Sequence, residues 1–265
     1  MPELRYGSKP VVPGAEGFRF IPVQLRFEER ERARFGYRMA RLTLDSACEP
    51  ADAERIVELC RSSSVEMLTL RVPTDKIVLV QALEALEFRI MDCLVYYECS
   101  TEDISAVKPP TVEIREARVE DATVVAEVAR LCFSAYFSHY HADDRLDRVK
   151  VSEGYVDWAQ RSCVDRDVAS CVYVPIVDKT VAGFITLRQN SPTEGEGVLN
   201  AVHPNFAGIG IYGQLIARSK QWCRDNGMKR MVISTQIDNL KVQRAWSNRG
   251  FHLYKSYYTL HRWFI

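Results

Sequence analysis

Hydrophobic and polar positions alternate in a regular order through the first part of the chain. Between about residue 21 and residue 99, β-rich runs are separated by segments whose apolar residues recur at helical spacing. The runs that predict strands are 35–46, 65–73 and 88–99, and the segments that predict helices are 51–62 and 76–87. This order predicts a β-α-β-α-β lobe with helices packed on a sheet.

A different order begins after residues 100–110, which have few apolar residues, end in a double proline and predict a linker. A strand at 111–117 and a helix from about 122 to 137 come next, followed by an irregular stretch. Further predicted elements are the helix 152–163 and the strands 170–177, 180–189 and 195–204. We therefore expect two domains, residues 1–105 and residues 111–265.

Composition narrows the class of protein. Among the 265 residues, 47% are hydrophobic and 26% are charged, which is typical of a globular protein with a real core. The 35 basic residues balance the 35 acidic ones, which argues against nucleic acid or a membrane surface as partner of the whole molecule. Residues 190–265 nevertheless hold ten lysines and arginines against four acidic residues. This local positive charge suits a cofactor that carries several phosphates.

The cysteine pattern and the first residues of the chain bear on the cellular compartment in which the protein is expected. Eight cysteines fall at irregular spacings without a C-x-x-C pair, a pattern that fits neither a zinc site nor a disulfide framework. No apolar run follows the first charged residues, and none reaches the roughly 18 residues that span a membrane. We expect reduced core thiols, no metal, and a cytoplasmic protein.

The most informative segment is 198–236. A β-rich run ends at Pro204, residues 205–210 turn the chain into a helix that Asn226-Gly227 ends, and 231–235 is the next strand. Glycines between a strand and a helix allow backbone N–H groups to approach an anion, so a pyrophosphate is the expected guest. A dinucleotide-binding reading is disfavoured, because this turn follows at least three antiparallel-looking strands and lacks an acidic residue near 230.

The segments after this turn complete a family pattern. Asp238 is expected to cap a helix that ends at Gly250, and residues 251–264 predict an aromatic strand or hairpin. The order resembles the GNAT superfamily of acyl-CoA-dependent N-acyltransferases, over roughly 111–265. Its glycine-turn motif, V-x-P-x-[YF]-R-G-x-G-[IV]-[GA], is matched by residues 202–212. Its helix motif, N-x-x-A-x-x-x-Y-x-x-x-G-F, is matched in spacing by Asn239, Val242, Trp246, Gly250 and Phe251.

The resemblance implies an α/β fold of the α+β type, with the mixed central sheet of the GNAT fold preceded by the smaller lobe. It also implies acetyl-CoA, or another short acyl-CoA, as cofactor, and direct attack of an amine on the thioester. A backbone N–H near Ala201–Val202 would hold the oxyanion. The residues implied in cofactor binding are Ala201, Val202, Ala207, Gly208, Ile209, Gly210, Ile211, Tyr212, Asn239 and Trp246.

Four positions depart from the family pattern, the first being Asn205 in place of the usual glutamine or arginine. Ala207 stands at the usual arginine, so contacts there would rest on backbone amides, and Tyr212 stands where a small residue is common. Trp246 replaces the tyrosine that usually protonates the leaving thiolate, and an indole N–H cannot act as that acid. The candidates for proton transfer are therefore the terminal-strand tyrosines Tyr254, Tyr257 and Tyr258, with His203 and Glu196 as relays from the substrate ammonium.

A narrower resemblance concerns the acceptor. The lobe, the linker and the stretch Ser138–Asp143 are similar to TDP-fucosamine acetyltransferase and related nucleotide-amino-sugar acyltransferases. His141 and Tyr155 would then contact the substrate, whereas His139, His141 and Asp143 make a poor zinc set. We expect an N-acetyltransferase of a nucleotide-linked amino sugar. The alternatives are another small amine or a peptide N-terminus as acceptor, or a catalytically impaired CoA-binding module; a homodimer is one option for the assembly.

Overall fold

The N-terminal half contains the predicted β-α-β-α-β series with two short elements before it. The computed structural model describes residues 24–102 and 111–265, so the first 23 residues and most of the predicted linker lie outside the described part. The elements are β1 (Arg26–Phe27), α1 (Glu29–Phe35), β2 (Met39–Thr43), α2 (Asp52–Ser62), β3 (Met67–Pro73), α3 (Ile77–Ala85) and β4 (Arg89–Ser100). The strand expected over 35–46 is shorter, because the chain up to Phe35 is the helix α1.

The C-terminal half follows the predicted order with shifted boundaries. Its strands are β5 (Glu113–Glu116), β6 (Cys171–Val177), β7 (Thr180–Val181), β8 (Gly183–Ser191), β9 (Glu194–Val202), β10 (Arg230–Gln236) and β11 (His252–Trp263). Its helices are η1 (Val119–Asp121), α4 (Ala122–Phe133), α5 (Arg148–Ser162), η2 (Pro204–Phe206), α6 (Ile211–Asp225) and α7 (Leu240–Ser247).

Two boundaries differ for local reasons. Helix α5 begins earlier than expected, since the Asp147 carboxylate accepts hydrogen bonds from the N–H groups of Val149 and Lys150 and so caps it. Asn239, and not Asp238, is the N-cap residue of α7. The aromatic end of the chain is one strand rather than a hairpin.

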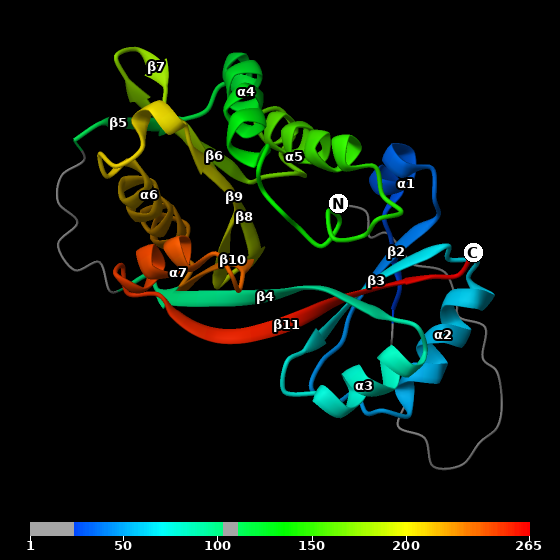
Figure 1. The fold of residues 1–265 in the computed structure, drawn as a ribbon. Helices are drawn as coiled ribbons and strands as arrows, with labels where there is room; N and C mark the ends of the chain where they lie inside the picture. The colour runs from blue at the N-terminus through cyan, green and yellow to red at the C-terminus, as the bar shows by residue number, and fades with distance from the viewer. Residues whose placement is uncertain (1–23, 103–110) are drawn as a thin grey trace, which may run out of the picture.

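One mixed sheet of 11 strands runs through both halves (Figure 1). Its order is β1-β2-β3-β11-β4-β10-β9-β8-β6-β5, with β7 paired to β6. The halves exchange strands: residues 94–100 of β4 pair with β10, and residues 257–263 of β11 pair with β3. The division at the linker stays a prediction, but the hydrogen-bonded ladder crosses it.

Helices cover the sheet on both faces of the C-terminal half (Figure 1). Helices α4 and α5 pack on one face, in a cluster with Phe184 and Leu199. Helix α6 and Trp246 of α7 pack on the other face, in a cluster with Ile185 and Ile233. Successive residues of a strand point to opposite faces, so the adjacent Phe184 and Ile185 serve different clusters. Helices α2 and α3 cover the N-terminal strands in a separate core.

The expectations about cysteines and membrane spans can be compared with the structure. All eight cysteines are free thiols, and five of them are buried. Within residues 24–102 and 111–265, the helices are too short or too polar to cross a bilayer.

The shared ladder predicts that damage to β11 destabilises the N-terminal half. Leu260 pairs with Leu70 of β3 and lies fully buried in the N-terminal core, so Leu260→Ala should lower the free energy of unfolding by about 2–5 kcal/mol. Leu253→Ala, at an exposed position of the same strand, is the matched control and should cost about 0.5 kcal/mol or less. Urea unfolding measures both; equal losses for the two variants would contradict the prediction.

Candidate functional site

An opening lies between the parallel strands β9 and β10. Their ladder runs from the Arg230–Glu194 pair to the Ile233–Gly197 pair and stops there, although both strands continue. On its other side β9 has a bulge against β8, where the Leu199 N–H donates to Thr186 Oγ1 at 3.0 Å. The bulge bends β9 at the point where pairing with β10 ends. Beyond Gly197, the backbone of β9 is therefore no longer paired with β10, although both strands lie in the middle of the sheet.

The glycine turn adjoins this opening, at the end of β9. Gly208 and Gly210 both have φ of +85°, a conformation that favours glycine, and a Cβ at either would meet nothing within 4 Å. The turn therefore borders open space at the positive end of α6. His203 stabilises the turn, since its Nδ1 accepts from the Asn205 N–H at 3.1 Å. Ala207 and Ile209 are exposed beside it.

Other residues expected at the cofactor hold helices α6 and α7 in place. The side chain of Ile211 lies in the core, so only its backbone can face a ligand in the turn. Asn239 Nδ2 donates to Thr235 Oγ1 at 3.0 Å and joins the start of α7 to β10. Trp246 is 1% exposed, and its Nε1 donates to the hydroxyl of Tyr212 at 2.7 Å. The structure thus brings Tyr212 and Trp246 together.

The strand tyrosines lie on the other side of the sheet. Tyr254 and Tyr257 both pack edge-on against Tyr96 of β4, whereas the next residue, Tyr97, packs against Trp246. Adjacent strand residues face opposite sides, so the sheet separates these tyrosines from the α6–α7 side. Burial raises the pKa of Tyr254 and of Tyr257.

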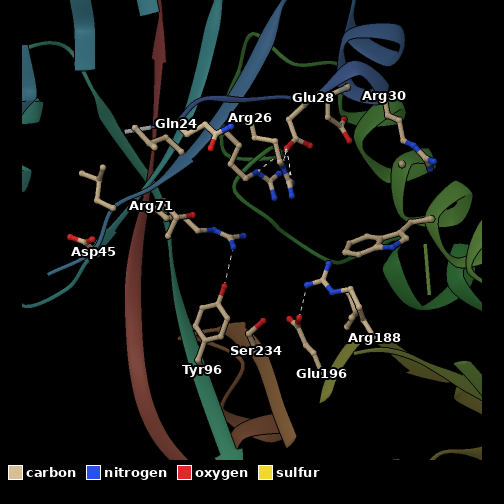
Figure 2. Close-up of a pocket in the computed structure, with 18 of the residues that line it drawn as sticks. Gln24, Arg26, Glu28, Arg30, Asp45, Arg71, Tyr96, Arg188, Glu196 and Ser234 are labelled. Atoms are coloured by element: carbon tan, nitrogen blue, oxygen red, sulfur yellow. Dashed lines mark hydrogen bonds and ion pairs between the residues drawn. The ribbon is translucent and has the colours of Figure 1, made fainter. Parts of the chain in front are cut away.

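A deep pocket occupies that opposite side, between the two halves of the chain (Figure 2). Its volume is about 660 Å³, and it reaches the β9–β10 opening at Val198 and Ser234. Seven arginines line it: Arg26, Arg30, Arg34, Arg41, Arg71, Arg161 and Arg188. Four acidic residues also line it: Glu28, Glu31, Asp45 and Glu196. The pocket is therefore rich in guanidinium groups, drawn from elements far apart in the sequence.

Several of these guanidinium groups are only partly satisfied. Arg71 donates to the Tyr96 hydroxyl at 3.0 Å, and Arg161 Nε donates to Asp157 at 3.1 Å. Buried nitrogens of Arg41, Arg71 and Arg161 have no hydrogen-bond acceptor among the described residues. Arg41 Nε also lies 3.8 Å from Glu28, in an ion pair too long for a hydrogen bond. Buried donors without a hydrogen-bond acceptor indicate a place for an anionic ligand. The pocket cannot be predicted from the sequence, because hydrophobic periodicity does not show that β1, α1, β3, α5 and β8 converge.

Glu196 lies at the boundary between the pocket and the opening. It belongs to β9, where its carboxylate accepts from Arg188 Nη2 at 2.5 Å (Figure 2). It is mostly buried, so the ion pair fixes its position. The sequence suggested a proton relay at Glu196 or His203; only Glu196 lines the pocket.

The predicted substrate contacts, His141 and Tyr155, do not line this pocket. His141 is buried; its Nδ1 accepts from the Ser138 N–H at 3.1 Å, and its Nε2 lies 3.3 Å from Ser152 Oγ. Tyr155 stacks on Phe133 with ring centroids 5.2 Å apart. His141 thus joins the loop before α5 to that helix, whereas Tyr155 packs α5 against α4. Their contact with a substrate stays a prediction.

His139 and Asp143 belong to a buried hydrogen-bond chain that reaches the last strand. His139 Nδ1 lies 2.8 Å from His261 Nε2, and His261 Nδ1 lies 2.7 Å from Asp143, which also accepts from Trp263. Within the described parts of the chain no group of three or more metal-ligating side chains occurs. Burial lowers the pKa of His139 and of His261, so both imidazoles are neutral. Burial opposes ionisation of Asp143, but its bonds from His261 and Trp263 lower its pKa.

The comparisons with known proteins identify the C-terminal half. Residues 125–251 match the model of the Acetyltransferase (GNAT) family. The chain therefore contains a GNAT acetyltransferase domain. The enzyme class that follows from this domain is acyl-CoA-dependent N-acetyltransferase. None of the curated proteins matches the sequence.

Solved structures resemble the chain over both of its halves. A functionally unknown conserved protein from Staphylococcus epidermidis has a TM-score of 0.61 at 13% identity, covering 86% of this chain and 85% of that one. A tandem GNAT protein from the clavulanic acid biosynthesis pathway has a TM-score of 0.58 at 13% identity, covering 85% and 75%. A GCN5-related N-acetyltransferase from Sphaerobacter thermophilus has a TM-score of 0.58 at 11% identity, covering 85% and 73%. At such identities the likeness shows the fold, and it extends beyond the GNAT domain into the N-terminal lobe.

The buried histidines predict that the folded protein loses stability in acid. The unfolded chain protonates its histidines near pH 6.5, whereas His139 and His261 resist protonation when folded. The unfolded state therefore binds more protons below that pH, and stability should fall by up to about 1.4 kcal/mol per pH unit for each histidine. His139→Gln should flatten this slope between pH 7 and 5. Urea unfolding at fixed pH values across this range measures the slope, and a wild-type slope in His139→Gln would contradict the prediction.

Proposed function

We propose that the protein transfers the acyl group of acetyl-CoA, or of another short acyl-CoA, to the amine of a nucleotide-linked amino sugar. The observation that carries the proposal is the arginine-lined pocket, which ends at the β9–β10 opening of the GNAT domain. Guanidinium groups bind phosphate oxygens in pairs, and a nucleotide-linked sugar carries two phosphates beside its amine. A pocket of about 660 Å³ is in the range used for such ligands.

The glycine turn fits the cofactor on the other face of the sheet. The backbone amides of Gly208, Ile209 and Gly210 would hold the pyrophosphate, with the positive end of α6 behind them. Because residue 207 is alanine, this site depends on amides rather than on an arginine side chain. The end of β9, at Ala201 and Val202, would lie along the extended arm of the cofactor. When bound, the cofactor supplies an activated thioester in the opening.

On the acceptor face, Glu196 would prepare the amine. An ammonium group is not nucleophilic until it loses a proton, and the Glu196 carboxylate lies at the end of the pocket nearest Val198 and Ser234. It takes that proton directly or through one water molecule. Arg188 holds the carboxylate in place through its 2.5 Å contact. The sheet keeps the two ligands on opposite faces, so they meet only in the opening, and this positioning supplies much of the acceleration.

An acceptor without phosphate would leave three buried guanidinium nitrogens of the pocket, on Arg41, Arg71 and Arg161, without a hydrogen-bond acceptor. This is the physical reason to favour a nucleotide-linked sugar over a small neutral amine or a peptide N-terminus.

Acceptor turnover tests the proposal directly. Thiol release from acetyl-CoA should be fast with TDP-linked 4-amino sugars and much slower with the same sugars lacking the nucleotide. Arg161→Gln should raise KM for the nucleotide-linked sugar about tenfold or more, since a charge-assisted hydrogen bond contributes about 1.5–3 kcal/mol. Arg32→Gln, at an exposed position outside the pocket, is the matched control. Equal turnover of both sugar forms, or none with either, would contradict the proposed acceptor.

The role of Glu196 predicts a loss in kcat rather than in binding. Glu196→Gln keeps the size and a hydrogen-bond acceptor for Arg188 but cannot take a proton, so kcat should fall about 10²–10⁴-fold at neutral pH. The rate should partly recover at high pH, where more of the acceptor amine is already neutral. A variant whose kcat and pH profile match the wild type would exclude this base.

A further inference from the structure

The leaving sulfur of CoA needs a proton, and the chain lacks the side chain that its family pattern places there. Residue 246 is tryptophan, whose indole can donate a hydrogen bond but cannot release a proton near neutral pH. Tyr254 and Tyr257 lie on the acceptor face with Tyr96, across the sheet from α6 and α7. An acid on the cofactor face has to come from another element.

Tyr212 supplies a phenol at this place. Its hydroxyl oxygen lies 2.7 Å from Trp246 Nε1. An indole nitrogen can only donate, so the phenol oxygen is the acceptor and its own proton points elsewhere. Among the described residues, the hydrogen bond from Trp246 is the one found at this oxygen. The hydroxyl is therefore fixed in position and retains a proton to donate.

The location of Tyr212 puts this hydroxyl close to the cofactor path. It is the second residue of α6, two residues beyond Gly210, at the end of β9 where that strand has parted from β10. Its side chain packs on the same cluster as Val202 of β9 and Val242 of α7. The glycine turn, the opening and the phenol are thus neighbours on one face.

We propose that Tyr212 is the acid that protonates the departing sulfur, and that Trp246 is a positioning residue that holds the phenol. The proposal rests on the acyl transfer proposed above. As the nitrogen–carbon bond forms and the carbon–sulfur bond breaks, the electron pair of the latter goes to sulfur, which takes the proton of Tyr212 Oη. The ammonium loses two protons in all, the first to Glu196 and the second as the amide forms. One of them restores the Tyr212 phenol through water and the other leaves to solvent, so the reaction yields amide, thiol and one proton without any other reactant.

The surroundings of the phenol fit this role. Burial raises the pKa of Tyr212, while the indole N–H and the positive charge of Arg249 act in the opposite direction. A Cβ at residue 213 would overlap the Arg249 guanidinium, so Gly213 is what lets this charge lie against the first turn of α6. The acid is thereby kept protonated at rest, and its anion is stabilised once the proton has left.

The first test needs no acceptor. Coenzyme A itself is bound to the protein, and its thiol is titrated by the ultraviolet absorbance of the thiolate. Tyr212→Phe should raise the pKa of the bound thiol, because the thiolate loses its hydrogen-bond donor, while affinity for CoA at neutral pH stays within a few-fold. The control is Tyr37→Phe. Tyr37 belongs to the N-terminal half and packs on Trp263, so its loss should leave the pKa of the bound thiol unchanged. An unchanged thiol pKa in folded Tyr212→Phe would overturn the proposal.

The second test measures catalysis. Tyr212→Phe should lower kcat about 10²–10⁴-fold, with less effect on the KM for acetyl-CoA. Adding Trp246→Tyr to Tyr212→Phe should restore part of the rate, since it returns a phenol to α7. A wild-type kcat in Tyr212→Phe alone would refute the assignment. Fluorotyrosine in place of Tyr212 keeps the fold and should shift the alkaline limb of the pH profile downward.

The two tests separate this proposal from the proposed function. If the wild type turns over no amine, the acceptor assignment fails, and the thiol titration still decides whether Tyr212 reaches the sulfur. If the wild type is active and both Tyr212 variants behave like it, only the acid assignment fails.

Discussion

The pairing of β4 with β11 is the interaction on which the rest of the structure depends. β4 comes from the N-terminal half and lies between β10 and β11, while β11 comes from the C-terminal half and lies between β3 and β4. Each half therefore completes the sheet of the other. The arginines of β1, α1 and β3 are held at a fixed distance from Glu196 and Arg188 because a continuous hydrogen-bonded ladder connects them. A pocket between two loosely linked domains would lack this rigidity.

The sheet also divides the chemistry. Tyr96 and Tyr97 are neighbours in β4, yet the first points to the arginine pocket and the second to Trp246. The bulge in β9 and the end of the β9–β10 ladder make the passage between these two faces. Charged groups for an anionic acceptor gather on one face, and amides, an indole and a phenol gather on the other. Neither ligand has to displace the other in order to bind.

Local pattern was enough to predict the order of elements and the glycine turn from the sequence. Alternation and helical spacing identified most helices and strands but missed the short elements β1 and α1. The start of α5 was misplaced, because the side chain of Asp147 caps the helix earlier than its apolar spacing indicates. Spacing in register with a family motif likewise located Tyr212, Asn239 and Trp246. The arginine pocket was out of reach, because it depends on strands exchanged between halves, which no local period encodes. His141 looked available in a polar loop, but three-dimensional packing buries it against Ser138 and Ser152.

The exchange of strands also constrains how the chain is made. The inner edge of β3 is covered by β11, whose residues leave the ribosome about 190 residues later, many seconds at ordinary rates of synthesis. Until then β3, a strand of seven mostly buried residues, presents an open hydrogen-bonding edge. The sheet of the N-terminal half therefore gains its last strand only when synthesis ends, although the rest of that half is synthesised first. Contacts this distant in sequence slow folding, and they make the early lobe the part of the nascent protein that most needs protection from other chains.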